Sequence, residues 1–382
     1  MGPGLGESGG ATAATSASTA GESEDAGVDE SSGDVKLDVG DGQGNDDDGG
    51  NVACDEDVPT PTPCDGDDDD PLHAIGVNCD PTNGVAARGA FDGPAGAMEV
   101  MTQTLGDGTY SAREGDKYLV LSTGVAAQIT QTPAMLCNVG PGGGDDGPAP
   151  GDPEDPEGAD PMTINCPSTD LPGPALDELP APLNIIPVDP LLMTTCEDDD
   201  SLVGTGDCSN TLWQQWQAAR VQGGLGATAH DYAEVRLTIP VPEDKGGIGF
   251  DFAFMSVEYP DFYKSEFNDM FVAWVESERW TGNISFDDQG NPISVNAGFL
   301  DYKDAPNDYD CPDCTAPELH GFAAQGHGAT RWLTSSTQVQ PGEDLTVVFS
   351  IFDLSDGELD SLVLIDNVHW TCAGAPTTTP VG

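Results

Sequence analysis

Alternation of polar and apolar residues with a period of two is the feature that most constrains the fold of this chain. It runs through residues 234–239 and recurs in three later runs, whose apolar members are Ile248, Phe250, Phe252 and Phe254, then Leu345, Val347, Phe349 and Ile351, then Leu362 and Leu364. Side chains two residues apart on a strand share one face, so the pattern predicts half-buried strands. Residues 210–221 (NTLWQQWQAARV) are the one stretch typical of a helix. Many short strands separated by turns predict an all-β fold, a jelly-roll-like β-sandwich over residues 73–372.

Two segments differ in composition from this predicted domain. Residues 1–72 contain 20 acidic residues, one lysine and no aromatic residue, and so little apolar surface predicts a disordered acidic spacer. The spacer ends in the aspartate run 65–70 (DGDDDD), which we interpret as solvated charge, with calcium binding as the alternative. Residues 138–200 are again rich in proline, glycine and acid, which predicts a long and partly disordered insertion, and residues 373–382 form a predicted tail.

The cysteines indicate an oxidising compartment. An even number of them in loop-like sequence favours disulfides, which persist outside the cytosol. The candidates for pairing are Cys54, Cys64, Cys79, Cys137, Cys166, Cys196, Cys208, Cys311, Cys314 and Cys372. We therefore expect an extracellular or outer-cell-surface location. No signal peptide is visible after Met1, so the export signal is expected upstream of this sequence.

The charge of the chain excludes several classes of partner. There are 68 acidic and 11 basic residues, a formal net charge of −57. Nucleic acids and anionic lipid headgroups are bound through Lys and Arg, so neither is an expected partner. No apolar run approaches the roughly 18 residues of a membrane span, so direct membrane insertion is not expected. We interpret the charge mainly as a solvated surface, with divalent-cation binding as the alternative.

Several stretches carry a resemblance to a known family. The most specific are FDFAFMSVEYPDFYKSEFNDMFVAWV (250–275), NISFDDQGNPISVN (283–296), and the run from WLTSSTQ to IDNVHW (332–370). In these stretches the chain resembles the bacterial choice-of-anchor L domain. YLVLSTGVAA (118–127) and LVGTGDCSN (202–210) extend the resemblance to about residues 74–372.

The resemblance implies an exported surface protein, attached by one of various anchors or secreted, with an adhesion or matrix role and no established catalytic residues. The chain departs from the family pattern in its acidic insertion and in having no recognisable anchor after residue 372. Attachment through a lipidated N-terminal cysteine, as in a lipoprotein, is therefore expected.

Two acidic clusters in predicted loops are candidates for a Ca²⁺ site. Ca²⁺ takes hard oxygen ligands from flexible loops, and loops from distant strands gather at one end of a sandwich, so the two clusters are expected to meet. The candidate ligands are Glu258, Asp261, Glu266, Asn268, Asp269, Asp353, Asp356, Asp360 and Asp366. The alternative is that Asp356 and Gly357 form a hairpin turn and the other carboxylates cap the backbone or face solvent.

Cysteine and aromatic side chains offer two further candidate sites. Cys311 and Cys314, followed by two histidines, have the donor set of a zinc site, but the spacing is loose and disulfide pairing is favoured. Tyr263 and Trp280, in predicted loops, are candidates for stacking on a sugar ring, with core packing as the alternative.

Taken with the resemblance, these patterns predict a binding module rather than an enzyme. The sequence lacks the motifs of serine hydrolases, zinc proteases and P-loop nucleotide hydrolases. We expect an exported cell-surface binding or adhesion module that is stabilised by Ca²⁺ and binds an extracellular glycan or a matrix or surface protein. The alternative is a secreted polysaccharide hydrolase using loop carboxylates such as Glu258 and Glu266. The oligomeric state is left open.

Overall fold

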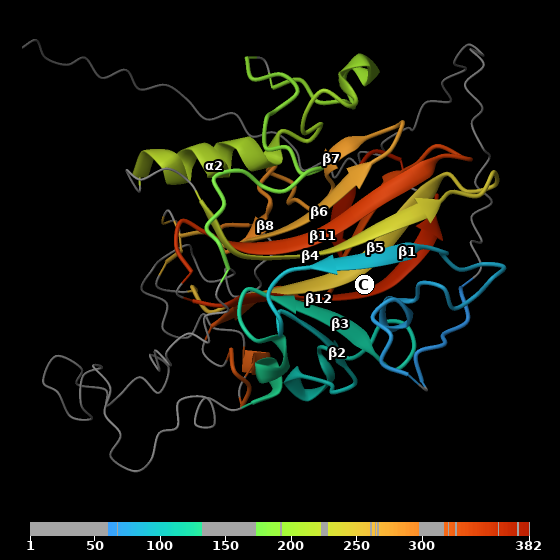
Figure 1. Cartoon of the computed structure of the whole chain (residues 1–382), viewed down its shortest axis with the longest axis vertical. Helices are drawn as coiled ribbons and strands as arrows, with labels where there is room; N and C mark the ends of the chain where they lie inside the picture. The colour runs from blue at the N-terminus through green and yellow to red at the C-terminus, as the bar shows by residue number, and fades with distance from the viewer. Residues whose placement is uncertain are drawn as a thin grey trace, which may run out of the picture. The chain divides into compact units, whose positions relative to one another are not determined.

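The computed structural model of the chain describes four stretches of sequence in which two antiparallel sheets lie face to face (Figure 1). The described residues are 60–131, 173–222, 228–297 and 317–381, apart from positions 67, 192, 260, 261, 264, 266, 320, 325, 326, 358 and 373. The predicted all-β class and the predicted sandwich are confirmed.

The two sheets are named sheet I and sheet II. Sheet I contains, in spatial order, β1 (Arg88–Asp92), β4 (Ala229–Pro240), β11 (Asp344–Leu354), β6 (Met270–Glu276) and β7 (Thr281–Asn283), with β8 (Ile293–Ser294) paired to β6. Sheet II contains β13 (Thr377–Pro380), β10 (Leu333–Gln338), β5 (Gly247–Ser256), β12 (Ser361–Thr371), β3 (Tyr118–Ser122) and β2 (Met98–Met101), with β9 (Gly328–Ala329) paired to β5. The helical elements are η1 (His73–Ile75), η2 (Gly106–Gly108), η3 (Ala126–Thr130), η4 (Asp200–Leu202), α2 (Thr211–Gln222) and η6 (Pro317–Leu319).

The pairing of eight strands has the nested order of a jelly roll. Along the chain these are β3, β4, β5, β6, β7, β10, β11 and β12, and the first pairs with the last, β3 with β12. The pairs β4 with β11, β5 with β10 and β6 with β7 then follow inward. Strands paired in this nested order resemble one long hairpin that folds over on itself. They divide into two four-stranded sheets, β3-β12-β5-β10 and β4-β11-β6-β7, as a double-sheet jelly roll requires. The predicted jelly-roll-like topology is therefore confirmed.

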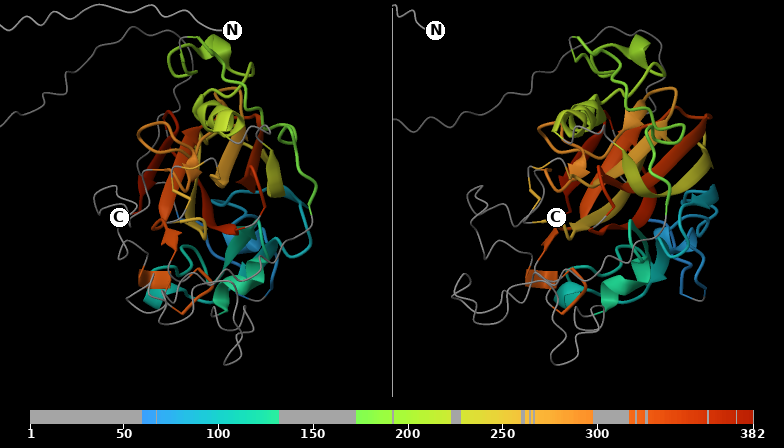
Figure 2. Two further views of the ribbon diagram at one scale, coloured as in Figure 1. Left: turned by 90° about the vertical axis from the view of Figure 1, so that its left-hand side faces the viewer. Right: turned by 60° about the vertical axis from the view of Figure 1, so that its left-hand side comes forward.

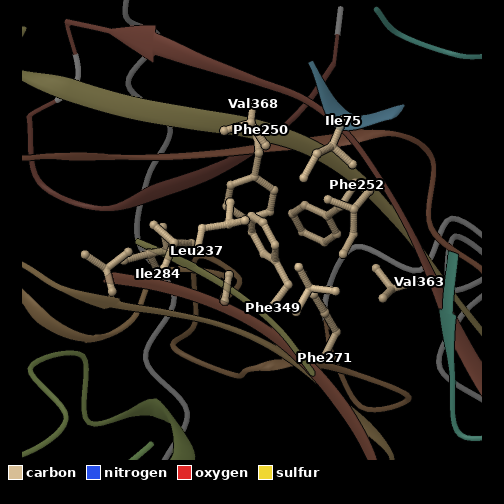
Figure 3. Close-up of a cluster of buried hydrophobic side chains, with 14 of the residues drawn as sticks. Ile75, Leu237, Phe250, Phe252, Phe271, Ile284, Phe349, Val363 and Val368 are labelled. Carbon is tan, nitrogen blue, oxygen red and sulfur yellow. The ribbon is translucent and has the colours of Figure 1, made fainter. Parts of the chain in front are cut away.

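The apolar residues of three of the four alternating runs fill the space between the sheets, whereas Leu362 and Leu364 of the fourth run lie on the outer face of sheet II. From β5 the cluster takes Ile248, Phe250, Phe252 and Phe254, and from β11 it takes Leu345, Val347, Phe349 and Ile351. Figure 3 shows the rings of Phe250, Phe252 and Phe349 close together, with the ring centroids of Phe250 and Phe349 4.7 Å apart. In these three runs the period-two pattern thus identified residues of the central core correctly.

Both sheets are also covered on their outer faces. On sheet I, α2 contributes Leu212 and Trp216 to a buried cluster with Trp274 and Phe352, and Figure 2 shows α2 lying against this sheet in both views. On sheet II, a second outer cluster includes Leu362 and Leu364 of β12 under residues 101–131 and 319–329. The predicted helix over 210–221 is therefore real, and it covers one sheet of the sandwich.

The folded domain begins earlier than the sequence predicted. Residues 60–72 were assigned to the spacer, yet Asp65 is 2% exposed and accepts hydrogen bonds from the backbone of Asp116 and Lys117. A disulfide joins Cys64 to Cys79, so the segment is fixed to the domain covalently as well. The rest of the predicted spacer, residues 1–59, lies outside the described residues.

The predicted disulfide and insertion assignments have mixed outcomes. Besides the N-terminal disulfide, Cys196 pairs with Cys208 in the second part of the insertion. Residues 173–200 pack on the domain, with Leu179 and Leu183 buried against sheet I, whereas 132–172 are not described. Cys372 is exposed just after β12, and its pairing stays a prediction. The remaining cysteines lie outside the described residues, and they are Cys54, Cys137, Cys166, Cys311 and Cys314.

Candidate cation-binding site

Two crossovers between the sheets leave the sandwich at the same end. In sheet II β5 runs antiparallel to β12, and in sheet I β6 runs antiparallel to β11. The end of β5 therefore lies beside the start of β12, and the end of β11 lies beside the start of β6. The β5–β6 crossover and the β11–β12 crossover carry the two predicted acidic clusters, which consequently meet.

Three buried carboxylates come together there, and we call them the end cluster: Glu258, Asp269 and Asp353. Each is at most 2% exposed. The backbone N–H of Asp269 donates to Oε2 of Glu258 at 3.3 Å, and the side chains of Asp269 and Asp353 hydrogen-bond to each other. Asp356 and Asp360 lie beside this cluster: the charge of Asp356 acts on Glu258 and Asp269, and Asp360 packs against Gly124.

Neutral donors from other strands complete the surroundings of the end cluster. The hydroxyl of Ser361, the first residue of β12, donates to Oδ2 of Asp269 at 2.6 Å. The hydroxyl of Thr123, which follows β3, interacts with Asp353. The second carboxylate oxygen of Asp353, Oδ1, is buried and has no hydrogen-bond partner among the described residues. A buried acceptor without a donor is unfavourable by about 1–3 kcal/mol.

Burial raises the pKa of every member of the end cluster. The pKa of Asp269 rises to about 7, first because its carboxyl is desolvated and further because of the charge of Asp356. The pKa values of Glu258 and Asp353 are raised well above their usual range by burial, and next by the charge of Asp269. Two carboxyls that hydrogen-bond to each other must share a proton, so the cluster retains protons near neutral pH unless a cation replaces them.

No basic side chain among the described residues forms an ion pair with Glu258, Asp269 or Asp353 of the end cluster. The described Asp, Glu, His and Cys side chains also contain no group of three already arranged as a metal site. The arrangement can therefore take a cation only through two of its carboxylates together with neutral oxygens, or after a side chain has turned.

Comparison with known families concerns the part of the chain that carries this cluster. Residues 225–369 match the family model of the Choice-of-anchor L domain. These residues form a Choice-of-anchor L domain. The predicted resemblance is thus confirmed for the stretch that runs from just before β4 to near the end of β12. No curated protein and no solved structure matches the chain significantly.

The Choice-of-anchor L domain indicates a surface-associated, extracellular protein, in agreement with the predicted location. The described helices include none that is both long and apolar enough to cross a membrane.

Several predicted ligands do not join the end cluster of the Choice-of-anchor L domain. Asp366 lies within β12, five residues beyond Ser361, where it accepts hydrogen bonds from the backbone of Arg113 and Glu114. Asn268 is buried, and its Oδ1 accepts the backbone N–H of Asn296. The prediction that Asp366 shares a site with the loop carboxylates is wrong, because this residue is inside a strand. Asp261 and Glu266 lie outside the described residues.

Both aromatic residues predicted to bind a sugar are in the core. Trp280 is 3% exposed, and its indole N–H points to the carbonyl oxygen of Asn283 at 3.4 Å. Tyr263 is 9% exposed and packs edge-on against Tyr259. Their prediction as surface platforms is wrong, because the loops that carry them fold back over the sandwich. The described large hydrophobic residues that are exposed are Phe91, Ile186 and Leu191.

Sequence reasoning missed several buried acids elsewhere in the described residues, among them Asp207, Asp65 and Glu114. Asp207 is fully buried at the start of α2, where it accepts four hydrogen bonds. Asp65 and Glu114 are buried near Asp366. The one local signal was the Asp207-x-Ser209 spacing, which is typical of a side chain that caps its own backbone. Glu114 has no such signal, since its burial depends on contacts with distant segments.

Proposed function

We propose that this chain is an exported, surface-associated binding or adhesion module whose Choice-of-anchor L domain is stabilised by Ca²⁺ at the end cluster. The observation that carries the proposal is the meeting of Glu258, Asp269 and Asp353 in a buried position without a basic partner among the described residues. A cation there would relieve the repulsion between the carboxylates and supply the interaction that Oδ1 of Asp353 lacks.

Ca²⁺ suits these residues better than a transition metal does. It accepts six to eight oxygen ligands in irregular geometry, and carboxylates, carbonyls and hydroxyls all serve. The end cluster offers carboxylate oxygens from both sheets and the Ser361 hydroxyl. Zinc and copper favour His and Cys donors, which the cluster does not contain. A bound Ca²⁺ would link the two crossovers and hold the end of the sandwich together.

Calcium-dependent melting tests this proposal. Extracellular modules bind Ca²⁺ with Kd of about 10⁻⁴–10⁻³ M, so 10 mM Ca²⁺ should stabilise the domain by about 1.4–2.7 kcal/mol. That corresponds to an increase in Tm of about 3–10 °C over a sample in EDTA. Glu258→Gln should reduce the increase by at least half, whereas the exposed Glu197→Gln should leave it unchanged. An equal Ca²⁺ response in E258Q and the unmodified chain would refute a site at the end cluster.

The proposed partner is an extracellular glycan or a matrix or surface protein. Surface association and the net charge of −57 support a partner that is neutral or basic. A glycan array and immobilised matrix proteins, each probed with and without Ca²⁺, test the partner class. Failure of the chain to bind in both assays would refute the proposed partner. The polysaccharide-hydrolase alternative gains no support from Glu258, because a buried carboxyl cannot contact a sugar chain. Release of reducing sugar from polysaccharides checks that alternative directly.

A further inference from the structure

A second group of buried acids lies away from the end cluster, and we call it the Glu114 group: Asp65, Glu114 and Asp366. Asp65 comes from the segment before η1, Glu114 from the loop before β3, and Asp366 from β12. Their exposed fractions are 2%, 6% and 0%. Asp366 is five residues from Ser361 along a strand, which places it about 16 Å from the end cluster.

Asp65 and Asp366 hold the loop that carries Glu114 from its two sides. Oδ2 of Asp65 accepts the backbone N–H groups of Asp116 and Lys117 at 2.8 and 2.6 Å. Oδ2 of Asp366 accepts the backbone N–H of Arg113 at 2.6 Å. The backbone of Glu114 is thereby fixed between two carboxylates, the charge of Asp65 acts on Glu114, and the charge of Glu114 acts on Asp366.

The carboxylate of Glu114 itself has no hydrogen-bond partner among the described residues. Both Oε1 and Oε2 are buried and without a donor, and burial raises the pKa of Glu114 to about 7, with the nearby charge of Asp65 as the second cause. The two basic side chains of the same loop are engaged elsewhere, since Arg113 pairs with Asp251 at 3.3 Å and Lys117 pairs with Asp69 at 3.0 Å. A buried carboxylate without a donor or a counter-charge is among the costliest groups in a folded protein.

A backbone carbonyl lies near the carboxylate of Glu114, beside Gly76. A methyl group placed on Gly76 would lie 3.3 Å from Oε2 of Glu114 and 3.7 Å from the carbonyl oxygen of Val368. The ladder between β12 and β5 shifts register between Asp366 and His369, so the backbone of Val368 is outside the regular pairing. Oε2 of Glu114 and the carbonyl oxygen of Val368 therefore lie near the same point beside Gly76, and no ion pair of the described residues involves Glu114.

We propose that the Glu114 group binds a second Ca²⁺, with Asp65, Glu114 and Asp366 as carboxylate ligands and the carbonyl oxygen of Val368 as a neutral one. Because no three described acids enclose one point, Glu114 has to turn about its side-chain bonds to close the site, and it breaks no hydrogen bond in doing so. The ion would fasten the segment 60–76 to β12, and so would join the N-terminal end of the domain to the jelly roll. This proposal does not depend on the end cluster.

Hydrogen exchange with Ca²⁺ as the probe tests the second site locally. Using the full chain stripped with EDTA, we expect 5 mM Ca²⁺ to slow amide exchange at least threefold in peptides covering 60–76 and 110–118. Glu114→Gln should abolish this slowing, Glu114→Asp should retain part of it, and Glu258→Gln should leave it unchanged. Melting of E114Q in EDTA checks that the variant is folded, since an amide of the same size in place of the carboxylate preserves the packing.

The possible outcomes decide between the two sites. Loss of protection in E114Q but not in E258Q supports the Glu114 group, even if the end cluster fails its own test. Unchanged exchange on adding Ca²⁺ to the unmodified chain would overturn this proposal, as would equal slowing in E114Q. Protection by 5 mM Mg²⁺ equal to that by Ca²⁺ would also overturn it, because diffuse screening of the acidic surface acts without these ligands.

Discussion

Asp207 allows the effect of one buried carboxyl on stability to be measured as a function of pH. It accepts the backbone N–H groups of Asn283 and Ser209 at 3.1 Å, and it joins α2 to β7. Burial nevertheless raises its pKa from 3.8 to about 6. Each pKa unit corresponds to 1.36 kcal/mol, so the ionised side chain destabilises the folded state by about 3 kcal/mol at pH values well above 6.

The sign of the effect follows from which state binds the proton more tightly. Between pH 3.8 and 6 the folded state keeps the Asp207 proton while the unfolded state releases it, so this residue lowers stability progressively as pH rises. Its contribution is fully favourable below pH 3.8 and is lost above the folded pKa of about 6. Asp207→Asn does not titrate, so the contribution of the asparagine itself to stability is the same at every pH. Relative to the unmodified chain, D207N should therefore gain about 2–3 kcal/mol between pH 4 and pH 7.5.

Urea unfolding in EDTA at several pH values measures this gain. The quantity of interest is the difference in unfolding free energy between D207N and the unmodified chain, which removes the pH dependence of all other groups. The exposed Asp288→Asn serves as the matched control and should give a difference without this rise. A flat difference for D207N, or one that falls with pH, would show that the hydrogen bonds to Asp207 outweigh its burial.

Three further predictions test the fold. Phe349→Ala, in the aromatic core, should cost about 3–5 kcal/mol in urea unfolding, whereas Phe91→Ala, at a side chain that is 37% exposed, should cost less than about 0.5 kcal/mol; similar losses would contradict the assigned core. Replacing both Cys196 and Cys208 by Ser should lower stability by about 2–4 kcal/mol under oxidising conditions and make the chain insensitive to reductant at that site. Gly282→Ala should destabilise by more than the roughly 1–2 kcal/mol expected for Gly290→Ala, because both glycines have positive φ but only the first would place a methyl 2.4 Å from Oδ1 of Asp207; equal losses would mean that Asp207 moves freely.

The central core was predictable because its signal is local. Phe250, Phe252, Phe349 and Ile351 were identified by alternation alone, and all four lie between the sheets. Alternation also indicates which residues share a face without showing what covers the other face. β5 is buried along its whole length, because residues far away in sequence cover the outer side of sheet II. The same limitation explains Trp280, whose loop position predicted exposure although the loop folds onto the sandwich.

The N-terminal boundary was predicted wrongly because composition averages over a segment. Residues 65–70 are almost entirely acidic, and solvated charge is the usual state of such a run. One member, Asp65, is nevertheless buried, because its carboxylate caps the backbone of a loop some fifty residues later. The disulfide from Cys64 to Cys79 brings this aspartate to the domain. Neither the cap nor the pairing has a signature within the run itself.

The end cluster shows how far topology can extend what a sequence predicts. Once the strands are assigned to a jelly roll, the nested order requires the β5–β6 and β11–β12 crossovers to share one end, so the meeting of Glu258 with Asp353 follows from the fold alone. The position of Asp366 could not be derived from topology in the same way, because it depends on the residue at which β12 begins rather than on which strands pair. The alternation at Leu362 and Leu364 already placed the residues before it inside a strand. An acid five residues into that strand lies about 16 Å from the crossover, too far to share an ion with it. Counting residues from the strand end, rather than grouping acids by their proximity in sequence, separates the Glu114 group from the end cluster.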